Sequence, residues 1–265
     1  MDIMDRLWEH NEAVYSEIND YFVLALQGSQ NYGIADKESD IDSKMLTIPS
    51  FKSLVYNSKP QNKVHIMDND EHCDLKDIRE YFKIIRKSNI NFVEILFTPY
   101  YIVNADYYDE WNFLRDNNEK IARLNPVRAV KCMAGMAKEK RHALCHEYPS
   151  RMSYIEKYGF DPKQLSHLMR IEFFVKYYIE GAPYKDCIYL RDKNLRGLLL
   201  AIKRNSGHWG LDRAINVADH CLQSIQKMVD EFCDKHPDKE DACASQILDE
   251  VLYWVIEKAV KKTLK

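Results

Sequence analysis

The sequence predicts an α+β fold, in which a mixed β-sheet with flanking helices is followed by a helical C-terminal region. Two patterns in the 265 residues predict it. Short apolar runs that end at glycine, proline or polar turns gather in the first part of the chain, as strands do. From about residue 105 onward, apolar side chains instead recur with helical spacing. We therefore expect an α/β domain over residues 1–105 and a helical domain over residues 106–265.

The front part divides into a helix, four strands and a second helix. Helical spacing of apolar residues indicates the first helix over 4–19, and the run YFVLALQ at 21–27 is typical of a buried strand. Asp77 stands where an N-cap is expected, before a helix that begins at residue 78. The other strands are expected at 39–48, 63–67 and 71–76.

The back part has the spacing of helices almost throughout. Residues 161–180 carry the clearest signals, because Asp161 can cap the helix, Pro162 takes its first position and Gly181 ends it. Helices are expected at 108–118, 126–147, 161–180, 192–204, 211–235 and 240–262.

Composition narrows the class of protein. Charged residues at 30% and hydrophobic residues at 46% exclude a disordered chain, and the net charge of −3 argues against a generally basic nucleic-acid coat. The seven cysteines form no CxxC pair and are expected to be reduced thiols. The acidic N-terminus lacks the features of a secretory signal, and no apolar run has the length of a membrane helix. We expect a cytoplasmic protein without a membrane partner.

Three carboxylates form the candidate site. Asp40 and Asp42 flank Ile41, so on a strand both point to one face, where their charges repel unless cations lie between them. Asp74, in the strand at 71–76, can complete the set, and the rival Asp77 is expected to cap a helix instead. Oxygen ligands without thiolate favour Mg²⁺ or Mn²⁺ over Zn²⁺.

A turn at Gly28 and Ser29 supplies the other half of the site. Glycine lets the backbone approach an anion, and the following amide and the serine hydroxyl can donate hydrogen bonds to phosphate oxygens. Carboxylates that hold cations, together with a turn that holds phosphates, describe a nucleoside-triphosphate site.

The stretch GSQNYGIADKESDID resembles the signature of the DNA polymerase β-like nucleotidyltransferases. It is more similar still to predicted bacterial and phage nucleotidyltransferases with the motif Gly-Ser-x-x-Tyr-Gly followed by Ser-Asp-x-Asp. SNINFVEILFTP resembles their Asn-Pro-x-x-x-Glu-x-Leu helix, with Ile90 in place of proline, and Lys163, His167 and Arg170 repeat their Lys-x-x-x-His-x-x-Arg. Ser43 and Lys44 differ from the residues that usually follow the two aspartates in that family. This difference leaves the substrate preference open and does not affect the expected metal site.

The resemblance implies a nucleotidyltransferase-like sheet, with the helical domain packing on the active-site cleft. It implies transfer of a nucleoside monophosphate from ATP or another NTP to a hydroxyl of RNA, protein or a small molecule, with release of pyrophosphate. Asp40 and Asp42 would bind two Mg²⁺ or Mn²⁺ ions, and Asp74 would bind one of them and act as, or position, the base. The remaining residues carried over, which would hold phosphate groups, are Gly28, Ser29, Lys163, His167 and Arg170.

Other interpretations stay open. The chain could be a nucleotide-binding regulatory or antitoxin-like module without turnover, although such a module has no need for three mutually repelling acids. Phosphohydrolase chemistry ranks last, because the only candidate pair, at 219–220, has the order DH. The charged row at 163–170 is also typical of a solvated helix face, and Tyr32 is expected to be a packing residue. A small acceptor-binding patch is expected at Lys131, Lys138, Lys140 and Arg141.

Overall fold

The computed structural model describes residues 2–37, 39–206 and 208–264, and its contacts divide the chain into two compact units. Unit 1 comprises residues 1–31, 36–125 and 240–265. Unit 2 comprises residues 32–35 and 126–239. The chain therefore leaves unit 1 twice and returns to it each time. The domain boundary expected between residues 105 and 106 stays a prediction.

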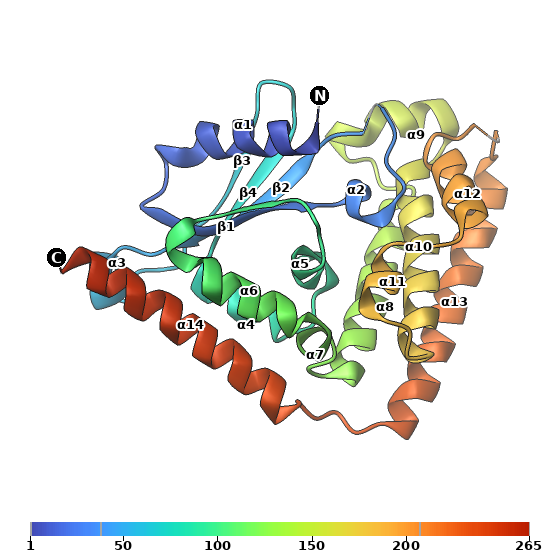
Figure 1. Cartoon of the computed structure of the whole chain (residues 1–265). Helices are drawn as coiled ribbons and strands as arrows, with labels where there is room; N and C mark the ends of the chain where they lie inside the picture. Colours follow the sequence, from blue (N-terminus) through green and yellow to red (C-terminus); the bar gives the residue numbers. More distant parts are fainter. Residues whose placement is uncertain (1, 38, 207, 265) are drawn as a thin grey trace. The chain divides into compact units, whose positions relative to one another are not determined.

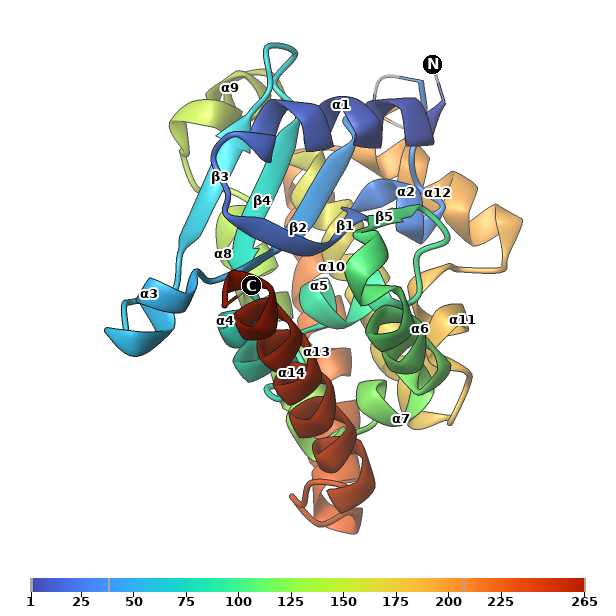
Figure 2. The same cartoon turned by 60° about the vertical axis from the view of Figure 1, so that its left-hand side comes forward.

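Unit 1 is built on a five-stranded mixed sheet with the strand order β3-β4-β2-β1-β5, most of which can be followed in Figure 2. The central strand β2 is antiparallel to β1 and parallel to β4, and β3 and β5 close the two edges in antiparallel pairs. The mixed sheet predicted from the sequence is thereby confirmed. The strands are β1 (Asp20–Gln27), β2 (Asp42–Ile48), β3 (Asn62–Ile66), β4 (His72–Asp77) and β5 (Tyr101–Val103).

Helix α1 (Ile3–Tyr15) crosses one face of this sheet (Figure 1). Its Leu7 and Val14 pack against a core that includes Leu24 of β1 and Met45 of β2. Burial of such apolar surface is the main stabilising contribution to this layer. The side chains of β2 and β4 that alternate with this core therefore point to the opposite face.

The opposite face of the sheet is covered by helices from three stretches of sequence. Phe22 of β1 packs edge-on against Tyr107 and Trp111, and the C-terminal helix α14 contacts α4, α6 and α7. The helices of this layer are α4 (Ile78–Ile85), α5 (Ile90–Val93), α6 (Tyr108–Asp116), α7 (Asn118–Ala122) and α14 (Ala242–Thr263). Two further short helices of the chain are α2 (Ser29–Tyr32) and α3 (Phe51–Val55).

Two details of the sheet differ from the sequence-based expectation. The strand expected from residue 39 begins at Asp42, because the Ile41 amide donates to the Glu71 carboxylate, 3.1 Å away, instead of to a neighbouring strand. Asp40 is therefore not a strand residue. The short edge strand β5 was not expected, since three residues carry too little pattern to indicate one.

Unit 2 is helical among its described residues, as expected. Helix α10 lies at its centre and packs on α8, α12 and α13. The predicted cap is confirmed, because Asp161 Oδ1 accepts a hydrogen bond from the Lys163 amide at 2.9 Å. The main helices are α8 (Pro126–Ala143), α9 (Met152–Tyr158), α10 (Pro162–Ile179), α11 (Tyr184–Ile188), α12 (Lys193–Lys203) and α13 (Leu211–Lys235). Within the described ranges of both units, no helix combines the length and apolar character needed to span a bilayer.

Candidate active site

Asp42 and Asp74 lie on the same face of the sheet. β2 and β4 run parallel and pair Lys44 with Asp74. Because side chains alternate along a strand, Asp42 shares a face with Lys44, and therefore with Asp74. The two aspartates are offset by two residues along the strands, roughly 6.6 Å, and by one strand spacing, roughly 4.8 Å. Asp74 therefore faces the same side of the sheet as Asp42, and its role as the third carboxylate stays a prediction.

The three carboxylates do not form a ready-made ligand set. Asp40 is exposed in the irregular segment before β2. Among residues 2–37, 39–206 and 208–264, no three His, Cys, Asp or Glu side chains are placed to share a metal ion. Their chemistry fits Mg²⁺ or Mn²⁺, since all are carboxylate oxygens and Asp42 and Asp74 face the same side. Lys44 Nζ, however, contacts the Asp74 carboxylate.

The Gly-Ser turn lies beside Asp42. Gln27, the last residue of β1, is paired with Asp42, and Gly28 follows with a left-handed φ of +86°. A Cβ at Gly28 would lie 3.8 Å from Asp42 Oδ2. On its other side Asp42 Oδ1 is 3.3 Å from both the amide and Nδ1 of His72. The pairing thus brings the predicted phosphate-binding turn next to one predicted metal ligand.

Glu94 joins this turn to the SNINFVEIL segment. Its carboxylate accepts a hydrogen bond from the Gly28 amide at 3.0 Å, and the Glu94 side chain is buried. A buried carboxylate needs such donors, because water cannot solvate it. The Gly28 amide therefore already donates its hydrogen bond to Glu94. Within this turn, the predicted hydrogen bonds to phosphate would come from Ser29.

Asp77 caps a helix, as expected. Its Oδ1 accepts a hydrogen bond from the Arg79 amide at 2.9 Å, and the Arg79 guanidinium pairs with the same carboxylate at 2.7 Å. As the last residue of β4, Asp77 is three positions from Asp74, which gives it the opposite parity along the strand. It is therefore not the third carboxylate on the Asp42 face.

A buried network supports the strand from the α1 side. His10 of α1 contacts the Ser43 hydroxyl through Nδ1 at 2.8 Å and Glu71 through Nε2 at 3.1 Å. Glu71 also contacts Arg6 and accepts from the Ile41 amide. The sequence analysis missed this network. Its one available signal was a histidine on the apolar face of the first helix, which more often marks a satisfied core residue than a site.

Tyr32, the tyrosine of the signature, belongs to unit 2 together with Gly33. It is only 4% exposed, which confirms the packing interpretation. The Arg170 guanidinium stacks 3.6 Å from the centre of its ring, and His167 meets the ring edge-on. Arg170 is 2% exposed, and its Nε has no hydrogen-bond partner within the described part of the chain. A buried donor without a partner is costly, which makes Arg170 suited to receive an anion.

The residues Lys163, His167 and Arg170 do not contribute equal charges. Burial lowers the pKa of His167 well below its usual value of 6.5, and the nearby cations Arg170, Lys163, Lys140 and Lys203 lower it further. The imidazole is thus neutral near pH 7. The positive charge expected from this trio is carried by Lys163 and Arg170 alone, and His167 offers a neutral hydrogen-bonding group.

The expected acceptor-binding patch is partly neutralised within unit 2. Lys131 pairs with Asp238 at 3.1 Å, Arg141 pairs with Asp219 at 2.6 Å, and Lys140 lies 3.4 Å from Glu139. Ion pairs of this exposed kind contribute little stability, but they reduce the charge that a polyanion meets. The patch is therefore weaker than its sequence indicates.

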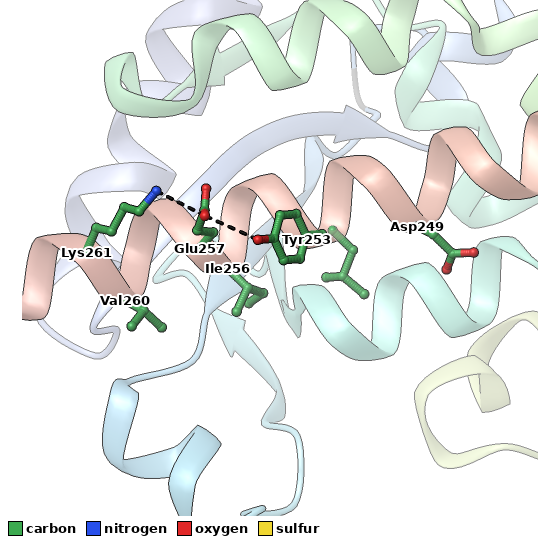
Figure 3. A pocket seen from close by; sticks show the side chains of 7 residues that line it. Asp249, Tyr253, Ile256, Glu257, Val260 and Lys261 are labelled. Atoms are coloured by element: carbon green, nitrogen blue, oxygen red, sulfur yellow. Dashed lines mark hydrogen bonds and ion pairs between the residues drawn. The ribbon is translucent and has the colours of Figure 1, made fainter.

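A shallow apolar depression follows one side of α14 and is shown in Figure 3. Glu257 accepts a hydrogen bond from the Tyr253 hydroxyl at 3.2 Å and pairs with Lys261 at 3.0 Å. None of the candidate site residues lines the depression. Its lining residues are Asp249, Leu252, Tyr253, Ile256, Glu257, Val260 and Lys261.

The mixed sheet, the turn after β1, and the aspartates on one face of β2 and β4 are the features of a DNA polymerase β-like nucleotidyltransferase. Residues 19–253 match the sequence profile of RlaP, the RNA repair pathway DNA polymerase beta family, and the chain belongs to that family.

Further similarities include one phage protein and one bacterial structure. An uncharacterized 38.9 kDa protein encoded in the nrdC-mobD intergenic region of Enterobacteria phage T4 is 26% identical over 108 residues, which is 37% of this chain. That match spans 32% of the phage protein's length. A nucleotidyltransferase-like protein from Exiguobacterium sibiricum 255-15 aligns with 98% of this chain and 92% of its own, at 12% identity and a TM-score of 0.32.

Proposed function

We propose that the protein transfers a nucleoside monophosphate from an NTP to a hydroxyl at an RNA end, with Mg²⁺ or Mn²⁺ as cofactor. The observation that carries the proposal is the position of Asp42, beside Gly28 and on the same face as Asp74, in a chain of the RlaP family. Asp40 and Asp42 would hold the ions, with Asp74 beside them. Two such ions stabilise the charge of an in-line displacement at the α-phosphate.

In the proposed step, the acceptor oxygen forms a bond to the α-phosphorus while the bond to the bridging oxygen breaks. Pyrophosphate leaves with the electron pair of that bond. The Asp74 carboxylate takes the proton of the acceptor hydroxyl, and Ser29 donates a hydrogen bond to the triphosphate. The role of the fold is to hold these groups in place before the reaction, so that little reorganisation is needed.

In unit 2, Lys163, His167 and Arg170 are proposed to bind phosphate groups. Arg170 is suited to this by its buried Nε, which has no hydrogen-bond partner among the described residues, and Lys163 adds a second positive charge. The neutral His167 would contribute a hydrogen bond without adding charge.

RNA is favoured as acceptor by two observations. The family description places RlaP in an RNA repair pathway. The second observation is that positive and negative residues are distributed unequally between the two units. Unit 2 has 20 Lys and Arg and 14 Asp and Glu, whereas unit 1 has 18 Lys and Arg and 27 Asp and Glu. A helical unit with a formal charge of +6 suits contacts to a phosphate backbone. An acidic chain with its charges evenly distributed would disfavour contacts to the RNA backbone.

The test is transfer of label from each α-labelled NTP, with Mg²⁺ or Mn²⁺, to a pool of short RNAs, a lysate protein fraction and small molecules. We expect label on RNA and a loss of at least about 100-fold in Asp42→Asn, as for the removal of a group that acts in the transition state. Asp68→Asn, which changes an exposed carboxylate in the β3–β4 turn, is the matched control and should keep full activity. Equal transfer by both variants would contradict the proposal.

The alternative is a nucleotide-binding module without turnover. The absence of a ready-made three-carboxylate set among the described residues is the observation that keeps it open. NTP binding that is unaffected by a chelator, together with no transfer to any acceptor, would favour this alternative over the enzyme.

A further inference from the structure

The structure places a lysine against the third carboxylate of the proposed site. The parallel pairing of β2 and β4 puts Lys44 opposite Asp74, and Lys44 Nζ contacts Asp74 Oδ2. Lys76 Nζ lies 3.8 Å from the other oxygen, Oδ1. Both oxygens of Asp74 therefore face ammonium groups supplied by the sheet itself.

Lys44 is not a mobile surface side chain. It is 3% exposed, and its Nζ lies 4.2 Å from the centre of the Phe92 ring, while Lys76 Nζ lies 5.6 Å from the same ring. A buried ammonium that has lost its water requires an opposite charge close by, and the face of an aromatic ring adds a smaller attraction. Asp74 and Phe92 together therefore hold Lys44 in place.

The formal charges of the three carboxylates and the two lysines can be summed. Asp40, Asp42 and Asp74 carry three negative charges, which alone would favour two divalent cations. Lys44 and Lys76 reduce the formal sum to −1, and both lysines lie at Asp74. Neither lysine lies at Asp42, whose Oδ1 is 3.3 Å from His72 Nδ1, so the charges of Asp40 and Asp42 are not balanced by these two ammonium groups.

We propose that Lys44 takes the place of a cation at Asp74, so that the resting protein holds one divalent ion, at Asp40 and Asp42. This inference rests on the proposed function and deepens it, because it assigns to Lys44 the place beside Asp74 that a cation would otherwise take. Lys44 is then a positioning residue, because it acts through the Asp74 carboxylate, which its contact holds in one orientation until substrates bind.

The test is a Mn²⁺ titration of the full chain without nucleotide, with unbound Mn²⁺ followed by electron paramagnetic resonance. We expect one bound ion in the wild type and two in Lys44→Met. The double variant Lys44→Met with Asp74→Asn should return to one ion, which would locate the gained ion at Asp74. Lys76→Met removes the same charge at a longer distance and should keep one ion, with an affinity within about threefold, since Lys44 still contacts Asp74.

Two ions in the wild type, or an unchanged single ion in folded Lys44→Met, would overturn the inference. If circular dichroism shows that Lys44→Met does not fold, Lys44→Gln replaces it, because its amide can still hydrogen-bond to Asp74. The ion count needs no transfer reaction, so it is independent of whether RNA is the acceptor. A wild type that binds no Mn²⁺ would overturn both this inference and the proposed metal dependence.

Discussion

Glu71 accepts a hydrogen bond at 3.1 Å from the backbone amide of Ile41, the residue between Asp40 and Asp42. The same carboxylate contacts Arg6 and His10, and His10 contacts Ser43 on the other side of Asp42. The backbone on both sides of Asp42 is thereby fixed from the α1 face, while the Asp42 side chain points to the opposite face. Such support holds a ligand in place before its ion binds.

Replacing Glu71 with glutamine should destabilise unit 1 by about 3 kcal/mol, because Arg6 and His10 lose a charged partner in a mostly buried network. The matched control is Glu9→Gln, since Glu9 also pairs with Arg6 but its side chain is 44% exposed. We expect an effect below about 0.5 kcal/mol there. Urea unfolding of both variants measures the difference, and similar losses for the two would refute the role assigned to the Glu71 network.

Local patterns were sufficient for much of this site. The run at 21–27 is followed by Gly28, and the period of two along each strand shows which neighbours share a face with Asp42 and which with Asp74. The long helices of the back part were likewise predictable, because caps such as Asp161 act within a few residues. These features depend only on residues that are near in sequence.

The rest depends on contacts that local patterns do not contain. The pairing of Lys44 with Asp74 follows from the register of two strands about thirty residues apart, and register is set by tertiary packing. His10 and Glu71 meet only because α1 lies on the sheet. A second contact of Glu71 explains why β2 begins at Asp42 and not earlier. The Glu71 carboxylate accepts the hydrogen bond of the Ile41 amide, which would otherwise pair with a neighbouring strand.

Gly33 of the signature should not tolerate a side chain. Its φ is +71°, and a Cβ there would lie 2.7 Å from both Arg196 Cδ and Tyr189 Cε2, all within unit 2. We expect Gly33→Ala to lower the free energy of unfolding by about 2–4 kcal/mol, from the left-handed backbone and the overpacking together.

The control for Gly33 is Gly135→Ala, in the interior of α8, where a Cβ would meet no atom within 4 Å. This change should stabilise unit 2 by about 0.5–1 kcal/mol, because alanine loses less conformational freedom than glycine when a helix forms. Thermal unfolding of the two variants gives the comparison. A Gly33→Ala protein as stable as the wild type would show that the contacts with Arg196 and Tyr189 are not maintained in solution.

The lowered pKa of His167 predicts a specific dependence of stability on pH. The unfolded chain takes up a proton at this residue near pH 6.5, whereas burial and the surrounding cations keep the folded imidazole neutral to lower pH. The unfolded state therefore binds more protons in this window, and stability is lost as the pH falls from 6.5 towards the folded-state pKa. Between about pH 7.5 and about pH 5.5, the loss from this one residue should be about 1 kcal/mol.

His167→Gln should remove that part of the acid-induced loss, because glutamine does not titrate. Urea unfolding at the two pH values measures it in the wild type, in His167→Gln and in His220→Gln, whose side chain is exposed on α13. We expect His220→Gln to follow the wild type and His167→Gln to lose less stability on acidification than either. If all three proteins lose the same stability, the His167 imidazole is accessible to protons in the folded protein, and the surrounding cations do not lower its pKa as the structure indicates.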